Sequence, residues 1–424
     1  MPPMASDRIG GLQVLFTMRR NALSAFPDRC INEPVVRLRA AGRPLALVTA
    51  PEAIAHMMIT NAEDYVRLPF GRRVLGPIVG KGLLVSEGET WRQQRRAMAP
   101  AFTPRNVAIM NTHILRCTEA ACERLERTKG QPVNLLDEMQ TLSLEIATTS
   151  LFSMEAAEFG AQIRALVSEY MGTVGRLYLT DVFLPESIPT PMRRKRADFR
   201  RRWLQLIQSI IAVRRRSGTA DAPRDLFDLL SDAHGADRQD LLADEVATMI
   251  VAGHETTAVT LFWICSLLAK SPEWQSKLAA SLPDHTVARA IVQETLRLYS
   301  PGFMAGRLAK RTHEVCGVEI PAGSIVLVPF WLIHRIPQLW PNPTAFDPSR
   351  FLDGREPVRH SYLPFGVGRH VCIGAQLALA EATLAIARLA QQFSMTMVDE
   401  QPLLPVATLT TRPNYAPKFI LRNH

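Results

Sequence analysis

Apolar residues recur at helical spacing along most of the chain, and this pattern predicts a mainly α-helical fold. The longest apolar run lies between Val246 and Ala269, within a helix predicted over residues 239–270. The polar stretch 254–257 interrupts the middle of that run. Because ionisable side chains are costly inside a bilayer, the pattern predicts a buried central helix and not a membrane span.

Two shorter regions have the pattern of strands. Apolar runs such as 45–48 predict a small sheet within residues 30–65, and the region 300–330 contains further strands and turns. The region from about 105 to 235 is mostly helical in pattern, with a loop and a short helix after Arg216. The predicted fold class is therefore mainly α with a small β-rich part.

Residues 66–85 are rich in glycine and proline, and the sequence predicts a long loop there. The loop also carries apolar side chains, among them Phe70 and Ile78. This composition is typical of a mobile lid or a pocket wall, and an ordinary connecting loop is the alternative.

The composition is that of a globular protein, since 47% of the 424 residues are hydrophobic and 21% are charged. Six cysteines are scattered without the close spacings of a disulfide framework, which predicts reduced thiols and a cytoplasmic location. Residues 1–50 contain no apolar run of the length that a signal peptide or a transmembrane anchor needs.

The formal net charge is +9, and much of the basic excess lies in three clusters, at 193–196, 200–202 and 214–216. Apolar residues lie between the clusters at helical spacing, so we expect the clusters to form the solvated face of an amphipathic helix. Contact with an anionic membrane surface is the alternative. No nucleic-acid-binding module accompanies the charge, so no nucleic acid is expected as a partner.

Cys372 lies in the glycine-rich turn 364–374, directly before residues with the pattern of an amphipathic helix. Backbone N–H groups at a helix start should lower the pKa of the thiol, which suits a thiolate nucleophile or a metal ligand. A small buried hydrophobe is the alternative for a free cysteine. A dinucleotide fingerprint is excluded because Val371 stands where glycine is needed, and the absence of a second nearby cysteine excludes zinc and iron–sulfur sites.

Trp91 and Arg95 share one face of a helix that Thr90 is expected to cap. An indole N–H and a guanidinium that point the same way suit a carboxylate. A tryptophan packed beside a surface arginine is the alternative.

The central helix carries a second group of polar side chains. A zinc protease motif is excluded because Ala258 stands where the second histidine is needed. Thr256 either donates back to the carbonyl of Ala252 or, if the helix opens at Gly253, stands beside water and the carboxylate of Glu255. Thr248, Met249, Ala252 and Thr256 share one helical face.

Four motifs, in order from about residue 65 to the end, resemble those of the cytochrome P450 family. They are the haem-ligand signature Phe365-x-x-Gly368-x-His370-x-Cys372-x-Gly374, the oxygen-activation motif Ala252-Gly253-His254-Glu255-Thr256-Thr257, the Trp91-x-x-x-Arg95 helix and the pair Glu294-x-x-Arg297. His370 stands where the family usually has arginine, and Ser349 and Ile336 also depart from the usual pattern.

The resemblance implies a haem-thiolate monooxygenase, with residues 1–424 as a single catalytic domain and haem b held between the long helix and the Cys372 helix. Cys372 would be the iron ligand, Glu255 and Thr256 the acid and alcohol that deliver protons, and Glu294, Arg297 and Arg350 a structural trio. The residues implied to contact the haem are Trp91, Arg95, Ala252, Arg307, Phe365, Gly368, His370 and Gly374. The residues expected to line the substrate pocket are Phe70, Thr248, Met249, Phe303, Met304 and Thr410.

The implied substrate is an apolar small molecule, and the implied oxidant is O2. The chain has no flavin or nicotinamide fingerprint, so electrons must come from a separate donor. A ferredoxin with its reductase is the first choice, with Arg95, Arg96, Arg359 and Arg369 as the docking cations, and a flavodoxin is the second choice. A monomer is expected. The alternatives are a peroxide-driven peroxygenase, a haem-thiolate isomerase and a non-catalytic haem carrier or sensor.

Overall fold

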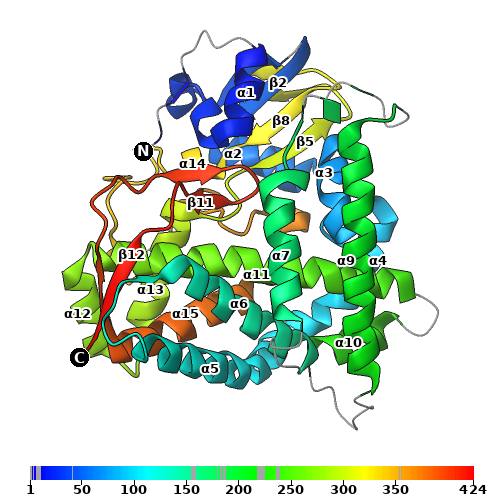
Figure 1. The fold of residues 1–424 in the computed structure, drawn as a ribbon. Coiled ribbons are helices and arrows are strands. Elements are labelled where there is room, and N and C mark those ends of the chain that lie inside the picture. Colours follow the sequence, from blue (N-terminus) through cyan, green and yellow to red (C-terminus); the bar gives the residue numbers. More distant parts are fainter. Residues whose placement is uncertain are drawn as a thin grey trace.

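The computed structural model describes residues 2–424, apart from 3, 6–10, 41, 154–158, 179, 182–183, 185–187, 217–224, 235–238, 353 and 355. Helices make up most of the described chain (Figure 1). Their bounds are α1 Gly11–Asn21, α2 Pro51–Ala55, α3 Pro69–Val79, α4 Gly88–Met98, α5 Pro104–Glu126, α6 Leu135–Phe152, α7 Gly160–Glu169, α9 Pro191–Arg216, α10 Leu226–His234, α11 Gln239–Ala269, α12 Pro272–Ser281, α13 Thr286–Tyr299, α14 Phe330–Ile333 and α15 Ala375–Gln392. The predicted mainly α fold class is confirmed.

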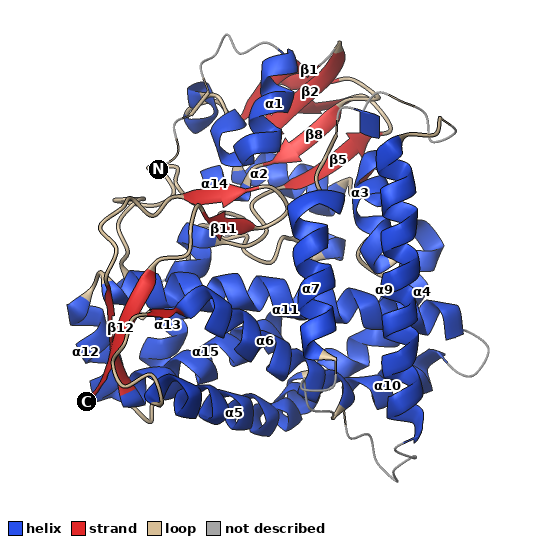
Figure 2. Ribbon diagram, viewed as in Figure 1, coloured by secondary structure: helices blue, strands red, loops and turns tan. Residues whose placement is uncertain are grey.

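The strands gather at the top and along one edge of the molecule (Figure 2). Their bounds are β1 Val35–Ala40, β2 Arg43–Val48, β3 Tyr65–Arg67, β4 Val133–Asn134, β5 Ala305–Ala309, β6 His313–Val315, β7 Val318–Ile320, β8 Ile325–Val328, β9 Phe393–Met397, β10 Pro405–Ala407, β11 Thr411–Pro413 and β12 Lys418–Asn423. The largest sheet has the order β1-β2-β8-β5-β3. It therefore joins the two regions in which the sequence predicts strands.

The long helix α11 runs through the middle of the helical layer (Figure 1). It packs against α6, α13 and α15, and most of its apolar side chains are fully buried. The segment 241–269 is long and apolar enough to cross a membrane, but 72% of its most apolar window is buried inside the protein. That burial agrees with the predicted core helix.

The predicted loop at 66–85 is wrong in its first half, where α3 forms. Pro69 occupies the first helical turn, where its missing N–H costs nothing, and Pro77 is accommodated inside the helix. Val74, Ile78 and Val79 are buried, and α3 packs on α11 and α9. Apolar burial at helical spacing therefore outweighs the glycine and proline content that favoured a loop.

The basic clusters lie on α9, as the amphipathic pattern predicts, but their side chains are not all solvated. Arg196 is buried in an ion pair with Asp181, and Arg214 is buried between Asp225 and Asp228. Buried arginines in these pairs tie α9 to the rest of the helical layer, which a charge count cannot reveal.

Candidate active site

Glycine is required at two positions of the cysteine loop. Gly366 and Gly368 have φ angles of +72° and +75°, a region that other residues rarely adopt. A Cβ on Gly368 would lie 2.0 Å from the carbonyl oxygen of Met58. The loop closes where the Cys372 N–H donates to the carbonyl of Phe365 at 2.9 Å, and α15 begins three residues later, with Gly374 at its N-cap.

Cys372 is an exposed residue, yet the surrounding protein desolvates its thiol. Both observations hold if the sulfur faces an interior surface and not the outside of the molecule. Burial raises the pKa of the thiol, while the backbone N–H of Gly374 and the charge of Arg95 act to lower it. The prediction of a lowered thiol pKa is therefore wrong for the metal-free protein, because desolvation outweighs the helix start.

Arginines surround His370, two residues before the cysteine. Arg67 and Arg307 pair across strands β3 and β5, and Arg67 donates to Nδ1 of His370 at 3.0 Å. Arg95 donates to the carbonyl of Val371 at 2.8 Å. Burial lowers the pKa of Arg307 and that of Arg67, the latter to about 10. The loop before Cys372 is thus lined by arginines whose charged form is destabilised by burial.

Burial and the neighbouring arginines lower the pKa of His370 to about 3, so its ring is neutral near pH 7. The ring centroid of Trp91 lies 4.3 Å from that of His370. Positive charge at this position therefore comes from the arginines, although the family usually has a cationic residue where His370 stands. The N-cap position of the helix that carries Trp91 is Glu87, which makes no side-chain capping bond, and the predicted cap Thr90 lies inside the first turn.

Ala252 is exposed in the middle of the otherwise buried helix α11, and Val251, Gly253 and Thr256 beside it are only partly buried. This part of the helix therefore borders an interior surface. Thr256 donates to the carbonyl of Ala252 at 2.5 Å, and the helix does not open at Gly253. Of the two alternatives that the sequence left for Thr256, the structure shows the bond back to its own helix.

The carboxylate of Glu255 takes no part in the bond between Thr256 and Ala252 and has other partners. Arg412 of β11 donates to its Oε1 at 2.5 Å, and Thr410 donates to the same oxygen at 3.2 Å. The hairpin that carries Thr410 therefore reaches the central helix. That Thr410 lines the substrate pocket stays a prediction.

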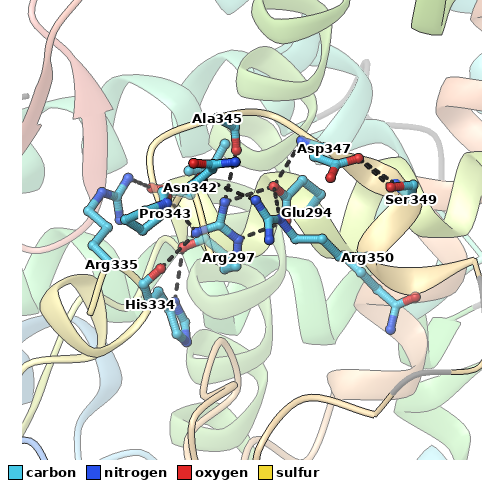
Figure 3. Close-up of polar contacts among 12 residues, drawn as sticks. Glu294, Arg297, His334, Arg335, Asn342, Pro343, Ala345, Asp347, Ser349 and Arg350 are labelled. Carbon is cyan, nitrogen blue, oxygen red and sulfur yellow. Dashed lines mark hydrogen bonds and ion pairs between the residues drawn. The ribbon is translucent and has the colours of Figure 1, made fainter. Parts of the chain in front are cut away.

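Glu294 and Arg297 form a fully buried bidentate pair on α13, with distances of 2.7 and 2.8 Å (Figure 3). Arg350 lies 3.5 Å from the same carboxylate. Arg297 also donates to the carbonyl of His334, whose Nδ1 bonds the carbonyl of Arg297. Nε2 of His334 accepts the N–H of Leu363 at 2.7 Å. This chain of bonds connects the ion pair to the segment that leads into the cysteine loop.

The residues expected to line a pocket are distributed unevenly. Met249 is buried next to the exposed part of α11, while Thr248 donates its hydroxyl to the carbonyl of Asp244. Phe303 is 5% exposed in a cluster with Trp331, against which Met304 is partly buried. The backbone of Phe70 lies in α3, but its side chain lies outside the described residues.

The family model described as Cytochrome P450 matches residues 12–419. The chain belongs to the cytochrome P450 family. This P450 is 34% identical to cyclooctat-9-en-7-ol 5-monooxygenase of Streptomyces melanosporofaciens, over 76% of this chain and 74% of the relative. It is 30% identical to cyclooctatin synthase of the same organism, over 92% and 88% of the two chains. P450 relatives named as monooxygenases and hydroxylases identify the chain as a monooxygenase that acts on an organic substrate.

Solved structures agree with this assignment. The crystal structure of CYP175A1 from Thermus thermophilus superimposes with a TM-score of 0.74 at 25% identity, covering 92% of each chain. The fold of the cytochrome P450DA heme domain matches with a TM-score of 0.81 over 100% of this chain and 98% of that chain.

P450 enzymes bind protoporphyrin IX haem through a cysteine thiolate, and the residues of this chain fit that group. Cys372 is an exposed residue whose thiol the surrounding protein desolvates. Arg67, Arg95 and Arg307 bring three positive charges to the loop, and the only carboxylate that the described residues place against Arg67 and His370 is Glu87. An excess of buried positive charge suits the two propionates of haem. Arg67 was not predicted, because no motif marks it.

Proposed function

We propose that Cys372 is the iron ligand and that Arg67, Arg95 and Arg307 hold the haem propionates. The observation that carries this assignment is the combination at Cys372 of an exposed residue and a desolvated thiol, in a loop held by Arg95 and by the His334 bond to Leu363. Bound haem supplies the activation of O2, and the protein supplies ligand, protons and pocket.

We infer further that Glu255 and Thr256 would deliver the protons that the reaction consumes. The reaction places one oxygen atom of O2 in the substrate and releases the other as water, with two electrons and two protons consumed. Thr256 lies on the partly exposed stretch of α11, and Glu255 precedes it with a carboxylate that Thr410 and Arg412 hold. An alcohol and an acid in adjacent positions suit proton transfer.

The proposed substrate is an apolar small molecule. Ala252 and Val251 present methyl groups where α11 borders the interior surface, and Met249 lies one turn away. The name of one relative describes an unsaturated alcohol, cyclooctat-9-en-7-ol. Unsaturated cyclic alcohols are therefore the first class to screen, by the shift in the haem absorption spectrum that accompanies substrate binding.

A small acidic ferredoxin is the proposed electron donor, with the enzyme acting as a monomer in the cytoplasm. Of the four arginines expected to dock the donor, Arg96 and Arg359 are exposed. Arg369 is engaged with Ala62 and Glu63, and Arg95 with the cysteine loop. The exposed pair is therefore available to an acidic partner.

The first experiment compares the carbon monoxide difference spectra of the reduced native protein, Cys372→Ser and Cys316→Ser. We expect the strongly red-shifted band of thiolate-ligated haem in the native protein and in Cys316→Ser, whose thiol is also exposed. Cys372→Ser should lose that band. A native protein that binds no haem, or a band that survives in Cys372→Ser, would contradict the assignment.

A further inference from the structure

The carboxylate of Glu255 is held by a residue outside every motif of the sequence. Its side chain is 3% exposed, and its one charged partner among the described residues is Arg412, at 2.5 Å from Nε to Oε1. A buried carboxylate needs a cation or hydrogen-bond donors to stay ionised. Arg412 is therefore the cation that holds the Glu255 carboxylate in this position.

Two observations show that the Glu255 carboxylate makes no hydrogen bond to the hydroxyl of Thr256. Oε2 of Glu255 is buried and has no hydrogen-bond partner in the described part of the chain. The hydroxyl of Thr256 donates to Ala252 and not to Glu255. The acid and the alcohol are therefore not connected to each other while Arg412 and Thr410 hold Oε1.

The hairpin β10–β11, which carries Arg412, is firmly attached to the rest of the molecule. Asn21 bonds Pro405 and Ala407 of β10 at 3.0 Å each. On β11, Trp263 of the central helix donates its indole N–H to the carbonyl of Thr411 at 3.0 Å. Arg412 is thus fixed relative to α11 by its own neighbour in the strand.

The turn of the same hairpin also lies against Gly175, next to the helical turn 170–174. A Cβ on Gly175 would lie 2.8 Å from the side chain of Leu409, and this glycine directly follows the helical turn 170–174. Leu409 and Thr410 are adjacent, so one turn contacts both Gly175 and Glu255. A ligand that moves the turn would move Thr410, one of the two residues that hold Glu255, while β11 keeps its bond to the central helix.

We propose that Arg412 is a positioning residue that sets where the Glu255 carboxylate lies. This inference rests on the proposed role of Glu255. It assigns to the C-terminal hairpin a part in the protonation step, in addition to the pocket contact expected of Thr410.

The test compares Arg412→Ala, Arg412→Lys and the control Arg422→Ala, an exposed arginine of β12. Each is measured as holoenzyme for product formed per electron consumed and for hydrogen peroxide released, with and without added guanidinium. The infrared band of the Glu255 carboxylate, identified by subtraction of Glu255→Gln, is recorded in the resting protein. This band reports the carboxylate directly and does not depend on turnover.

We expect Arg412→Ala to lower product per electron about tenfold, with the lost electrons recovered as peroxide, and to shift or abolish the ionised carboxylate band. Guanidinium should restore part of the yield. Arg412→Lys should lie between the native protein and Arg412→Ala, and Arg422→Ala should behave as native. An unchanged band together with native product yield in Arg412→Ala would overturn the proposal.

The double variant Glu255→Gln, Arg412→Ala separates this inference from the function on which it rests. If Arg412 acts through Glu255, its removal adds nothing once Glu255 is neutral. If Glu255→Gln alone leaves product yield unchanged, the proposed role of Glu255 fails. If Glu255→Gln lowers the yield but Arg412→Ala does not, only the role of Arg412 fails.

Discussion

Glu381 places a carboxyl group in the interface between α15 and the central helix. Thr257 of α11 donates to its Oε2 at 3.0 Å, and the residue is only 5% exposed. Burial raises the pKa of Glu381 from 4.5 to about 7. The helix that follows the cysteine and the helix that carries Thr256 are therefore joined by a carboxyl group that titrates near neutral pH.

Replacement of Glu381 by Gln should change how stability depends on pH. The folded-state pKa is the higher one, so the favourable protonated form contributes fully below about pH 4.5, and its contribution is lost as pH rises through 7. Relative to native, Glu381→Gln should therefore gain up to about 3 kcal/mol between pH 4.5 and 8. Thermal unfolding of the holoprotein at several pH values measures this.

The exposed Glu400→Gln serves as the control for that measurement. Glu245 also has a pKa raised to about 7 by burial, so each variant is compared with the native protein at the same pH. A stability difference between Glu381→Gln and native that stays constant from pH 4.5 to 8 would contradict the prediction.

At this scale, motif residues could be located from the sequence, and their partners could not. The positions of Cys372 and Trp91 follow from local spacing and from turn and helix signals. Arg67 and Arg412 lie in short strands without a motif, and they reach the site only through pairing with distant segments, as Arg67 does with Arg307. When a residue reaches the site only because its strand pairs with a distant segment, the sequence around that residue has no pattern that marks it.

Among the elements, the segment between α13 and the cysteine loop depends on Arg297. One guanidinium holds the Glu294 carboxylate and the carbonyls of His334, Pro343 and Ala345 (Figure 3). Burial lowers the pKa of His334 to about 3, so its neutral ring bonds both Arg297 and Leu363. The position of the loop is thus set by a helix far from it in sequence.

Arg297→Ala should destabilise the protein by about 3–5 kcal/mol, because Glu294 would remain buried without its partner. We also expect faster transfer of haem to an excess of a haem-binding acceptor protein, since the cysteine loop loses its support. Arg297→Lys keeps the charge but cannot make all these bonds, so it should fall between Arg297→Ala and native.

Arg289→Ala is the matched control, since Arg289 is an exposed arginine of the same helix. Denaturant unfolding and haem transfer should leave it close to native. The role of Arg297 would be refuted if both measurements gave equal results for the two alanine variants.

Helices and strands could be predicted where apolar periodicity is not opposed by glycine and proline content. The central helix and strand β2 follow from apolar periodicity, and their observed bounds are close to those expected. In α3, glycine and proline argued for a loop while Val74 and Ile78 had the spacing of a helix, and burial against α11 and α9 decided the outcome. Composition alone could not weigh that packing. That all these elements form one domain stays a prediction.

For the whole molecule, charge on one face should govern association with the electron donor. Arg96 of α4 and the exposed Arg359 are the proposed contacts. Arg96→Glu with Arg359→Glu should slow the first electron transfer from ferredoxin at low salt by about tenfold or more, and should weaken its dependence on ionic strength. Stopped-flow reduction under carbon monoxide measures this rate.

Arg422→Glu is the control, because β12 and α4 lie at opposite edges of the molecule (Figure 1). It changes net charge by the same amount per substitution but should leave the rate and its salt dependence close to native. Equal slowing by Arg422→Glu would indicate that overall charge, and not this face, steers the donor.

The five-stranded sheet also constrains the order in which the protein is completed during synthesis. Its parallel pairing of β2 with β8 joins Leu45 to Ile325, 280 residues later. At the usual 5–20 residues per second, a ribosome needs roughly 14–56 s to make that stretch. Until then, β2 has an unpaired edge, and Arg67 has no Arg307 beside it. With Cys372 as the proposed iron ligand, which is made later still, we expect the nascent chain to capture its cofactor only near the end of translation.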